Sequence, residues 1–116
     1  MNLPHQEPLI FAKKIVQRDK STATVLCEFS TIPTISMFIE AAAQSSSAFS
    51  NHEDIKIGFL TLAKNVKLLN EIREKKFLLN LNIEIELNNI KQFSFEAYQK
   101  QNGTKVVTGN FTIAIQ

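Results

Sequence analysis

An uninterrupted alternation of apolar and polar residues near the middle of the chain constrains its fold more than any other feature. The apolar positions are Leu79, Leu81, Ile83, Ile85 and Leu87, and each residue between them is Asn or Glu. Successive side chains of a strand point to opposite faces, so a strand over Phe77–Asn88 would bury one face and leave the other exposed to solvent. We therefore predict an antiparallel sheet, with Leu79, Leu81, Ile83 and Ile85 facing a covering layer.

Similar but shorter patterns flank this strand on both sides. Strands are predicted over residues 9–17, 22–29 and 55–66, around 93–97, and over 107–115. Turn residues separate them at 18–21, at Asn88-Asn89, and at Asn102-Gly103, where the Asn-Gly pair favours a type I′ hairpin turn. The chain is thus expected to form a largely antiparallel sheet.

One helix is predicted among these strands, from Thr34 to about Phe49, after Pro33 and the capping candidates Ser30, Thr31 and Thr34. Ser36, Glu40, Gln44 and Ser47 fall on one stripe of this helix, and small or apolar residues cover the rest. We expect the sheet to enclose the helix and Glu40 to be partly desolvated, which suits a carboxylate that transfers protons. A lone Glu on a helix is also typical of a solvent-facing position.

Composition and short motifs restrict the number of domains and the classes of partner and cofactor. The 116 residues fit one domain, residues 1–116, and the net charge of +2 with scattered Lys and Arg argues against a nucleic-acid partner. The basic run Arg73-Glu74-Lys75-Lys76 is interpreted as a solvated turn between strands. The sequence has no Gly-rich phosphate loop, no G-x-S-x-G motif and no ligand spacing typical of a metal site, so we expect no cofactor and no metal.

The lone cysteine and the N-terminal residues indicate in which cellular compartment the protein is expected. Cys27 lies in an alternating apolar run and is expected to be a buried thiol, which excludes an intramolecular disulfide. No run approaches the roughly 18 apolar residues of a membrane span, and the start lacks the basic and apolar regions of a signal peptide. We expect a cytoplasmic protein without a membrane span.

Four local motifs carry a family resemblance. They are Leu3-Pro4-His5-x-x-Pro8, Ile39-Glu40-Ala41-Ala42-Ala43-Gln44, Gly58-Phe59-Leu60 with residues 63–67, and residues 93–97 with 102–109. In this order they resemble the hotdog-fold 3-hydroxyacyl-acyl-carrier-protein dehydratases, and the last resembles the branch associated with aryl-polyene synthesis. The resemblance implies an α+β hotdog fold, in which a long central helix is wrapped by a curved antiparallel β-sheet.

The resemblance also implies catalytic residues. Glu40 and Gln44 match the helix signature of the family, so Glu40 would transfer a proton and Gln44 would orient it or bind substrate. The family's catalytic His comes from the segment before the helix, but residues 25–33 contain no His here. His5 is the remaining candidate by motif, whereas His52 follows the helix in a polar turn and is expected to be solvated.

Substrate and partners follow from the same resemblance. The expected function is binding and dehydration of 3-hydroxyacyl thioesters on acyl-carrier protein or CoA, in fatty-acid or polyene synthesis, by a homodimer or a pair with a related hotdog subunit. The chains would join sheet edge to sheet edge. Substrate would meet backbone N–H groups near Pro33, Ile35 and Ser36 and a tunnel lined by Phe38, Phe59 and Leu60. Two alternatives are an acyl thioesterase, for which one carboxylate suffices, and a non-catalytic acyl-carrier or lipid-binding subunit.

Overall fold

A six-stranded antiparallel sheet curves around one helix in the computed structural model, which describes residues 11–49 and 58–115. The strand order is β1-β2-β4-β5-β6-β3, and every neighbouring pair is antiparallel. The elements are β1 (Ala12–Arg18), β2 (Thr22–Glu28), α1 (Ile35–Ser45), a 3₁₀ turn (Ser46–Phe49), β3 (Gly58–Leu68), β4 (Lys76–Glu86), β5 (Ile90–Gln99) and β6 (Lys105–Ile115).

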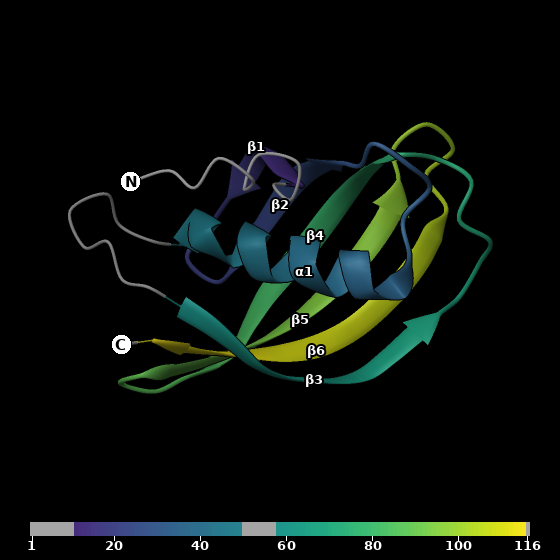
Figure 1. The fold of residues 1–116 in the computed structure, drawn as a ribbon. Helices are drawn as coiled ribbons and strands as arrows, with labels where there is room; N and C mark the ends of the chain where they lie inside the picture. Colours follow the sequence, from purple (N-terminus) through teal and green to yellow (C-terminus); the bar gives the residue numbers. More distant parts are fainter. Residues whose placement is uncertain (1–10, 50–57, 116) are drawn as a thin grey trace, which may run out of the picture.

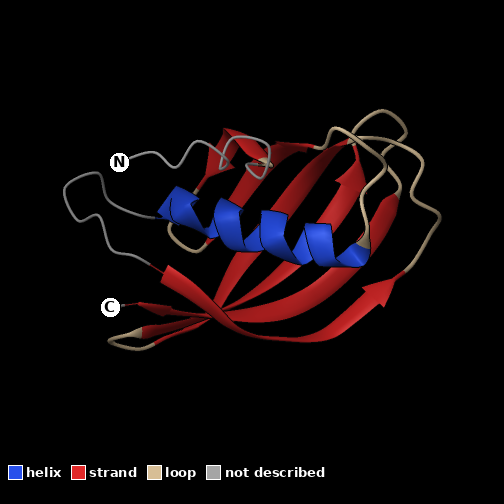
Figure 2. Cartoon of the chain, viewed as in Figure 1, coloured by secondary structure: helices blue, strands red, loops and turns tan. Residues whose placement is uncertain are grey.

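The helix lies across the concave face of the sheet (Figure 1). Strands β4 and β5 cross behind α1, and β6 and then β3 curve below it (Figure 1 and Figure 2). A sheet and a helix, each apolar on one side, bury those sides against each other in this arrangement. The predicted α+β architecture is confirmed.

The predicted register of the long strand is confirmed except at its end. Leu79 and Leu81 are completely buried, and Ile83 is half-buried against the core, but Ile85 is 50% exposed. A register shift interrupts the β4–β5 pairing between Ile83 and Ile85. The prediction that Ile85 faces the helix was therefore wrong, because β4 runs past the part of the sheet that α1 covers. On β6, which was predicted as a strand, Val107, Phe111 and Ile113 are buried.

The α-helix is shorter than predicted at its C-terminal end. Thr34 is the N-cap, since its hydroxyl accepts a hydrogen bond from the backbone N–H of Met37 at 3.3 Å. The α-helix ends at Ser45 and continues as the 3₁₀ turn to Phe49. The Ser45 and Ser46 hydroxyls bond back to helix carbonyls at 2.7 and 2.6 Å, which competes with regular helix formation at this end.

Strand β3 forms one edge of the sheet and is bent. Its pairing with β6 is interrupted twice, and Asn65 within the second interruption has a φ of 56°. Asn is one of the few residues other than Gly that adopt this left-handed conformation readily. Leu60 and Leu62 on this edge are exposed, so β3 carries apolar side chains that the described chain does not cover.

Aromatic side chains dominate the core between helix and sheet. Phe38 of α1 packs edge-on against Phe77 and Phe29, with ring centroids 4.8 and 5.3 Å apart. Cys27 is buried as predicted, with its sulfur 3.5 Å from the Ser45 hydroxyl, and burial raises the pKa of its thiol to about 11. Among the described residues, no helix is long and apolar enough to cross a membrane.

Candidate functional site

Glu40 lies on the side of α1 that faces away from the sheet. Ser36, Glu40 and Ser47 are exposed and Gln44 is half-buried, so the predicted polar stripe exists. We expected Glu40 to be partly desolvated, but in the single chain it is exposed. The reason is that Phe38, Ala41, Ala42 and Ser45 occupy the side of the helix that the sheet covers.

Gln44 connects Glu40 to the start of β1. Its side-chain oxygen accepts hydrogen bonds from the backbone N–H groups of Phe11 and Ala12 at 2.7 and 3.2 Å. Its side-chain NH₂ donates to Oε2 of Glu40 at 3.4 Å. With its oxygen held by two backbone donors, the Gln44 amide can present only its NH₂ group to Glu40. The pair of residues that sequence reasoning selected is thus brought together, one helical turn apart.

The N-terminus of α1 supplies backbone donors on the same helix. Thr34 engages the N–H groups of Met37 and Phe38, the first through its hydroxyl and the second through its carbonyl. The N–H groups of Ile35 and Ser36 belong to the first turn, where no helical carbonyl can accept their hydrogen bonds. Ser36 and Glu40 lie four residues apart on the same stripe, about one helical turn from each other.

The other predicted site residues are distributed differently. Pro33 is buried beside the helix start, and Phe38 is enclosed in the aromatic core. Leu60 is 40% exposed on the edge strand. The side chain of Phe59 and both histidines, His5 and His52, lie outside the described residues. The lining of an acyl tunnel by Phe38, Phe59 and Leu60 stays a prediction.

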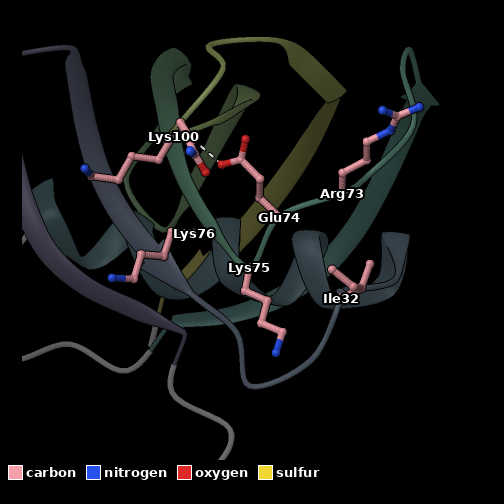
Figure 3. Close-up of a pocket in the computed structure, with 7 residues that line it drawn as sticks. Ile32, Arg73, Glu74, Lys75, Lys76 and Lys100 are labelled. Atoms are coloured by element: carbon pink, nitrogen blue, oxygen red, sulfur yellow. Dashed lines mark hydrogen bonds between the residues drawn. The ribbon is translucent and has the colours of Figure 1, made fainter.

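A basic hollow at the N-terminal end of α1 escaped the sequence analysis. It has a volume of about 530 Å³ and is lined by Ile32, Arg73, Glu74, Lys75, Lys76, Lys100 and Gln101 (Figure 3). The run 73–76 precedes and enters β4, as predicted for a turn between strands, but the structure places it beside the β5–β6 hairpin. Lys100 is too distant in sequence to be grouped with this run by pattern alone.

The buried amide of Gln99 holds this region together. Gln99 is only 2% exposed, and its side-chain oxygen accepts hydrogen bonds from the backbone N–H groups of Arg73 and Glu74 at 2.6 and 3.1 Å. The Glu74 carboxylate in turn accepts from the N–H groups of Gln101 and Asn102 at 2.8 and 3.2 Å. Sequence alternation through Phe93, Phe95 and Ala97 places position 99 on the inward face, which was the available signal for a buried Gln.

Metal-ligating side chains do not gather in the part of the chain that the structure describes. No group of three or more His, Cys, Asp or Glu residues within 11–49 and 58–115 is arranged to hold a metal ion.

Comparison with known proteins identifies the fold. No protein-family model matches the sequence, and no curated protein matches it significantly. Among solved structures, a thioesterase family protein from Silicibacter pomeroyi is similar with a TM-score of 0.70 and 16% identity, covering 97% of this chain and 89% of that chain. A homologue of HP0420 from Helicobacter felis has a TM-score of 0.69 and 18% identity, covering 99% and 91%.

A third similar structure contains a ligand. It is a hypothetical thioesterase from Streptococcus pneumoniae solved with coenzyme A, with a TM-score of 0.64 and 11% identity, covering 89% of this chain and 84% of that chain. At these identities the likeness concerns the fold, which is the arrangement of helix and sheet described above. The chain has the hotdog fold, as the sequence resemblance implied, and the similar structures include thioesterase proteins.

Proposed function

We propose that this chain binds acyl thioesters and hydrolyses them, with Glu40 as the general base. The observation that carries the proposal is the Glu40–Gln44 pair, a solvent-accessible carboxylate hydrogen-bonded to an amide that the β1 backbone holds in place. Similar solved structures described as thioesterases, one of them with coenzyme A, support this reaction class.

The reaction needs one proton-transfer group and one set of hydrogen-bond donors to the oxyanion. Glu40 takes a proton from a water molecule, whose oxygen attacks the thioester carbonyl carbon. The resulting oxyanion accepts hydrogen bonds from the N–H groups of Ile35 and Ser36, where the helix dipole also favours negative charge. The carbon–sulfur bond then breaks, and the leaving thiolate takes the proton that Glu40 holds, which restores the carboxylate. Gln44 orients the Glu40 carboxylate during these steps.

Hydrolysis fits the residues better than dehydration. Dehydration of a 3-hydroxyacyl thioester removes a proton next to the carbonyl and also protonates the departing hydroxyl, so it uses two proton-transfer groups. The family's His is missing from residues 25–33. A single carboxylate is sufficient to activate water. The dehydratase resemblance therefore remains the second candidate, supported by the helix signature around Glu40.

Thioester turnover by the wild type and the Glu40→Gln variant tests the proposal. The wild type should release free thiol from acyl-CoA substrates, and Glu40→Gln should lower kcat by roughly 10²–10⁴-fold. Because Glu40 is exposed within the single chain, its replacement should not lower the free energy of unfolding by more than about 0.5 kcal/mol. Glu86→Gln, at an exposed position on β4, is the matched control and should retain activity.

The assay also separates the alternatives. Incubation with crotonyl and 3-hydroxyacyl thioesters distinguishes release of thiol from hydration or dehydration of the carbon chain. Binding without either reaction would indicate a non-catalytic acyl-carrier or lipid-binding subunit. Full turnover in Glu40→Gln would contradict the role of Glu40 as base.

We further propose that two chains, or this chain and a related hotdog subunit, associate through the β3 edge. Strand β3 pairs only with β6 among the described strands, and Leu60 and Leu62 are exposed along it. An unpaired, apolar strand edge is a surface that proteins usually cover. A closed pair of chains would cover it on both subunits at once.

A further inference from the structure

The basic hollow concentrates positive charge at one end of the molecule. Four cationic side chains and one carboxylate among its seven lining residues give a net charge of +3, whereas the whole chain has a net charge of +2. The one carboxylate, Glu74, already accepts two backbone hydrogen bonds. Arg73 is paired with Glu71 at 3.0 Å outside the hollow, so among the residues that the structure describes the lysines supply most of the charge without an ion-pair partner.

Two of these lysines face each other across neighbouring strands. The backbone N–H of Lys100 donates to the carbonyl of Lys76 at 3.0 Å, which sets the two residues opposite each other. Figure 3 shows their side chains extending to the same side, whereas Lys75 extends away from both. Like charges directly opposite each other destabilise a sheet. Glu28 pairs with Lys76 in the β2–β4 register, but no ion pair within 4 Å joins them.

Hydrogen bonds fix the backbone segments that carry these lysines. Gln99 fixes the backbone of Arg73 and Glu74, and Glu74 fixes the start of the β5–β6 hairpin. The N–H of Phe29 donates to the carbonyl of Lys75 at 2.8 Å, which ties the run to the end of β2. A concave surface with uncompensated ammonium groups on a fixed backbone favours a multiply charged anion.

We propose that this hollow binds the phosphate groups of a pantetheine-type thioester carrier. The assignment rests on the proposed thioester function, because that function says which phosphates would be nearby. Ile32 in the hollow is followed along the chain by the Ile35 and Ser36 donors and then by Glu40. At about 1.5 Å per helical residue, Ile35 and Glu40 lie roughly 7.5 Å apart along the axis. The hollow therefore lies at the end of α1 from which the proposed oxyanion donors follow.

Binding measurements on a variant with three lysine substitutions test the site. The variant combines Lys75→Gln, Lys76→Gln and Lys100→Gln, all exposed positions, so the fold should persist. Calorimetry with CoA should show at least tenfold weaker binding than the wild type, and wild-type binding should weaken as salt concentration rises. Pantetheine, which has no phosphate, should bind the variant and the wild type equally.

The matched control removes the same charge elsewhere. It combines Lys13→Gln, Lys14→Gln and Lys20→Gln, exposed positions on β1 and in the turn after it. Its affinity for CoA should stay within about twofold of the wild type, since net charge alone acts weakly at a distance in salt. Equal affinities of the two triple variants for CoA would overturn the assignment of the hollow.

4′-Phosphopantetheine distinguishes the sources of phosphate. A tenfold loss for CoA and for 4′-phosphopantetheine assigns the hollow to the phosphate that CoA shares with carrier proteins. A loss of affinity for CoA alone assigns the hollow to the phosphates of the CoA nucleotide. Either result supports the proposal. Hydrolysis of acyl-pantetheine tests the thioesterase function separately, because that substrate has no group for the lysines to bind. Hydrolysis of acyl-pantetheine, with CoA binding that does not depend on the lysines, would refute only the assignment of the hollow. CoA binding that depends on the lysines, without hydrolysis of acyl-pantetheine, would refute only the thioesterase reaction.

Discussion

Replacing Gln99 with Leu should reveal how much the loop before β4 depends on one buried amide. Leu is close to Gln in size and fills most of the same space, so the cost of a cavity is small. The main loss is the hydrogen-bond acceptor for the N–H groups of Arg73 and Glu74. In the wild type, their nitrogens lie 2.6 and 3.1 Å from the Gln99 side-chain oxygen. The third contact, 3.4 Å from the Gln99 NH₂ group to the Asn102 side-chain oxygen, joins an exposed residue, so water can replace it in the variant.

The expected magnitude follows from these two bonds. A neutral hydrogen bond contributes about 0.5–1.5 kcal/mol net, so two lost bonds should cost about 2 kcal/mol of unfolding free energy. Arg73 is exposed and Glu74 is half-buried, so the cost should stay below the full penalty of unsatisfied buried donors. For a domain of this size, about 2 kcal/mol corresponds to a fall in Tm of roughly 8 °C.

Urea unfolding and amide hydrogen exchange measure the effect together. Gln99→Leu should lower the unfolding midpoint and speed exchange at the amides of residues 73 and 74. Gln101→Leu, two residues on at an exposed position, should change stability by less than about 0.5 kcal/mol. Unchanged stability, with residues 73 and 74 as protected as in the wild type, would refute the reasoning that Gln99 holds this loop.

Two further predictions concern the edge strand and the thiol. Leu62→Lys, at a position 52% exposed on β3, should shift the protein from dimer to monomer in sedimentation, whereas Leu87→Lys, at a position 62% exposed after β4, should not. A wild-type protein that is monomeric at micromolar concentration would contradict the proposed assembly. With a pKa of about 11, roughly one Cys27 thiol in a thousand is ionised at pH 8, so alkylation should be slow in the folded protein and fast in urea; rapid alkylation without denaturant would contradict this burial.

Local patterns were sufficient to predict most of the fold. Alternation depends only on neighbouring residues, so the inward positions Leu79, Leu81 and Phe111 could be assigned without knowing what they contact. The pattern failed at Ile85, because the limit of the covered area is set by the length of α1 and by a shift in strand pairing. Neither property is visible within one strand. The cap at Thr34 was among three candidates, and only the geometry of the chain entering α1 selected it.

The candidate site was predictable in part for the same reason. Glu40 and Gln44 are four residues apart on one helix, so their proximity follows from helical geometry. The contact of Gln44 with Phe11 and Ala12 spans more than 30 residues and could not be derived from spacing. The basic hollow likewise depends on packing between the run 73–76 and Lys100, which the buried side chain of Gln99 brings about.

The exposure of Glu40 links the proposed reaction to the proposed assembly. The sheet of one chain covers only one side of α1, so the desolvated carboxylate expected from the small residues of this helix is not formed within the single chain. Ser36 and Ser47 are small residues on the exposed side, where another surface could approach closely. Strand β3 contacts α1, so association at the β3 edge would bring a second chain near the helix. A carboxylate is a stronger proton acceptor when water is partly removed from it. We therefore expect Leu62→Lys to lower thioester turnover together with dimer content, although Leu62 is not part of the Glu40–Gln44 pair. A monomeric Leu62→Lys protein with full turnover would show that one chain suffices for catalysis and that Glu40 acts while exposed to solvent.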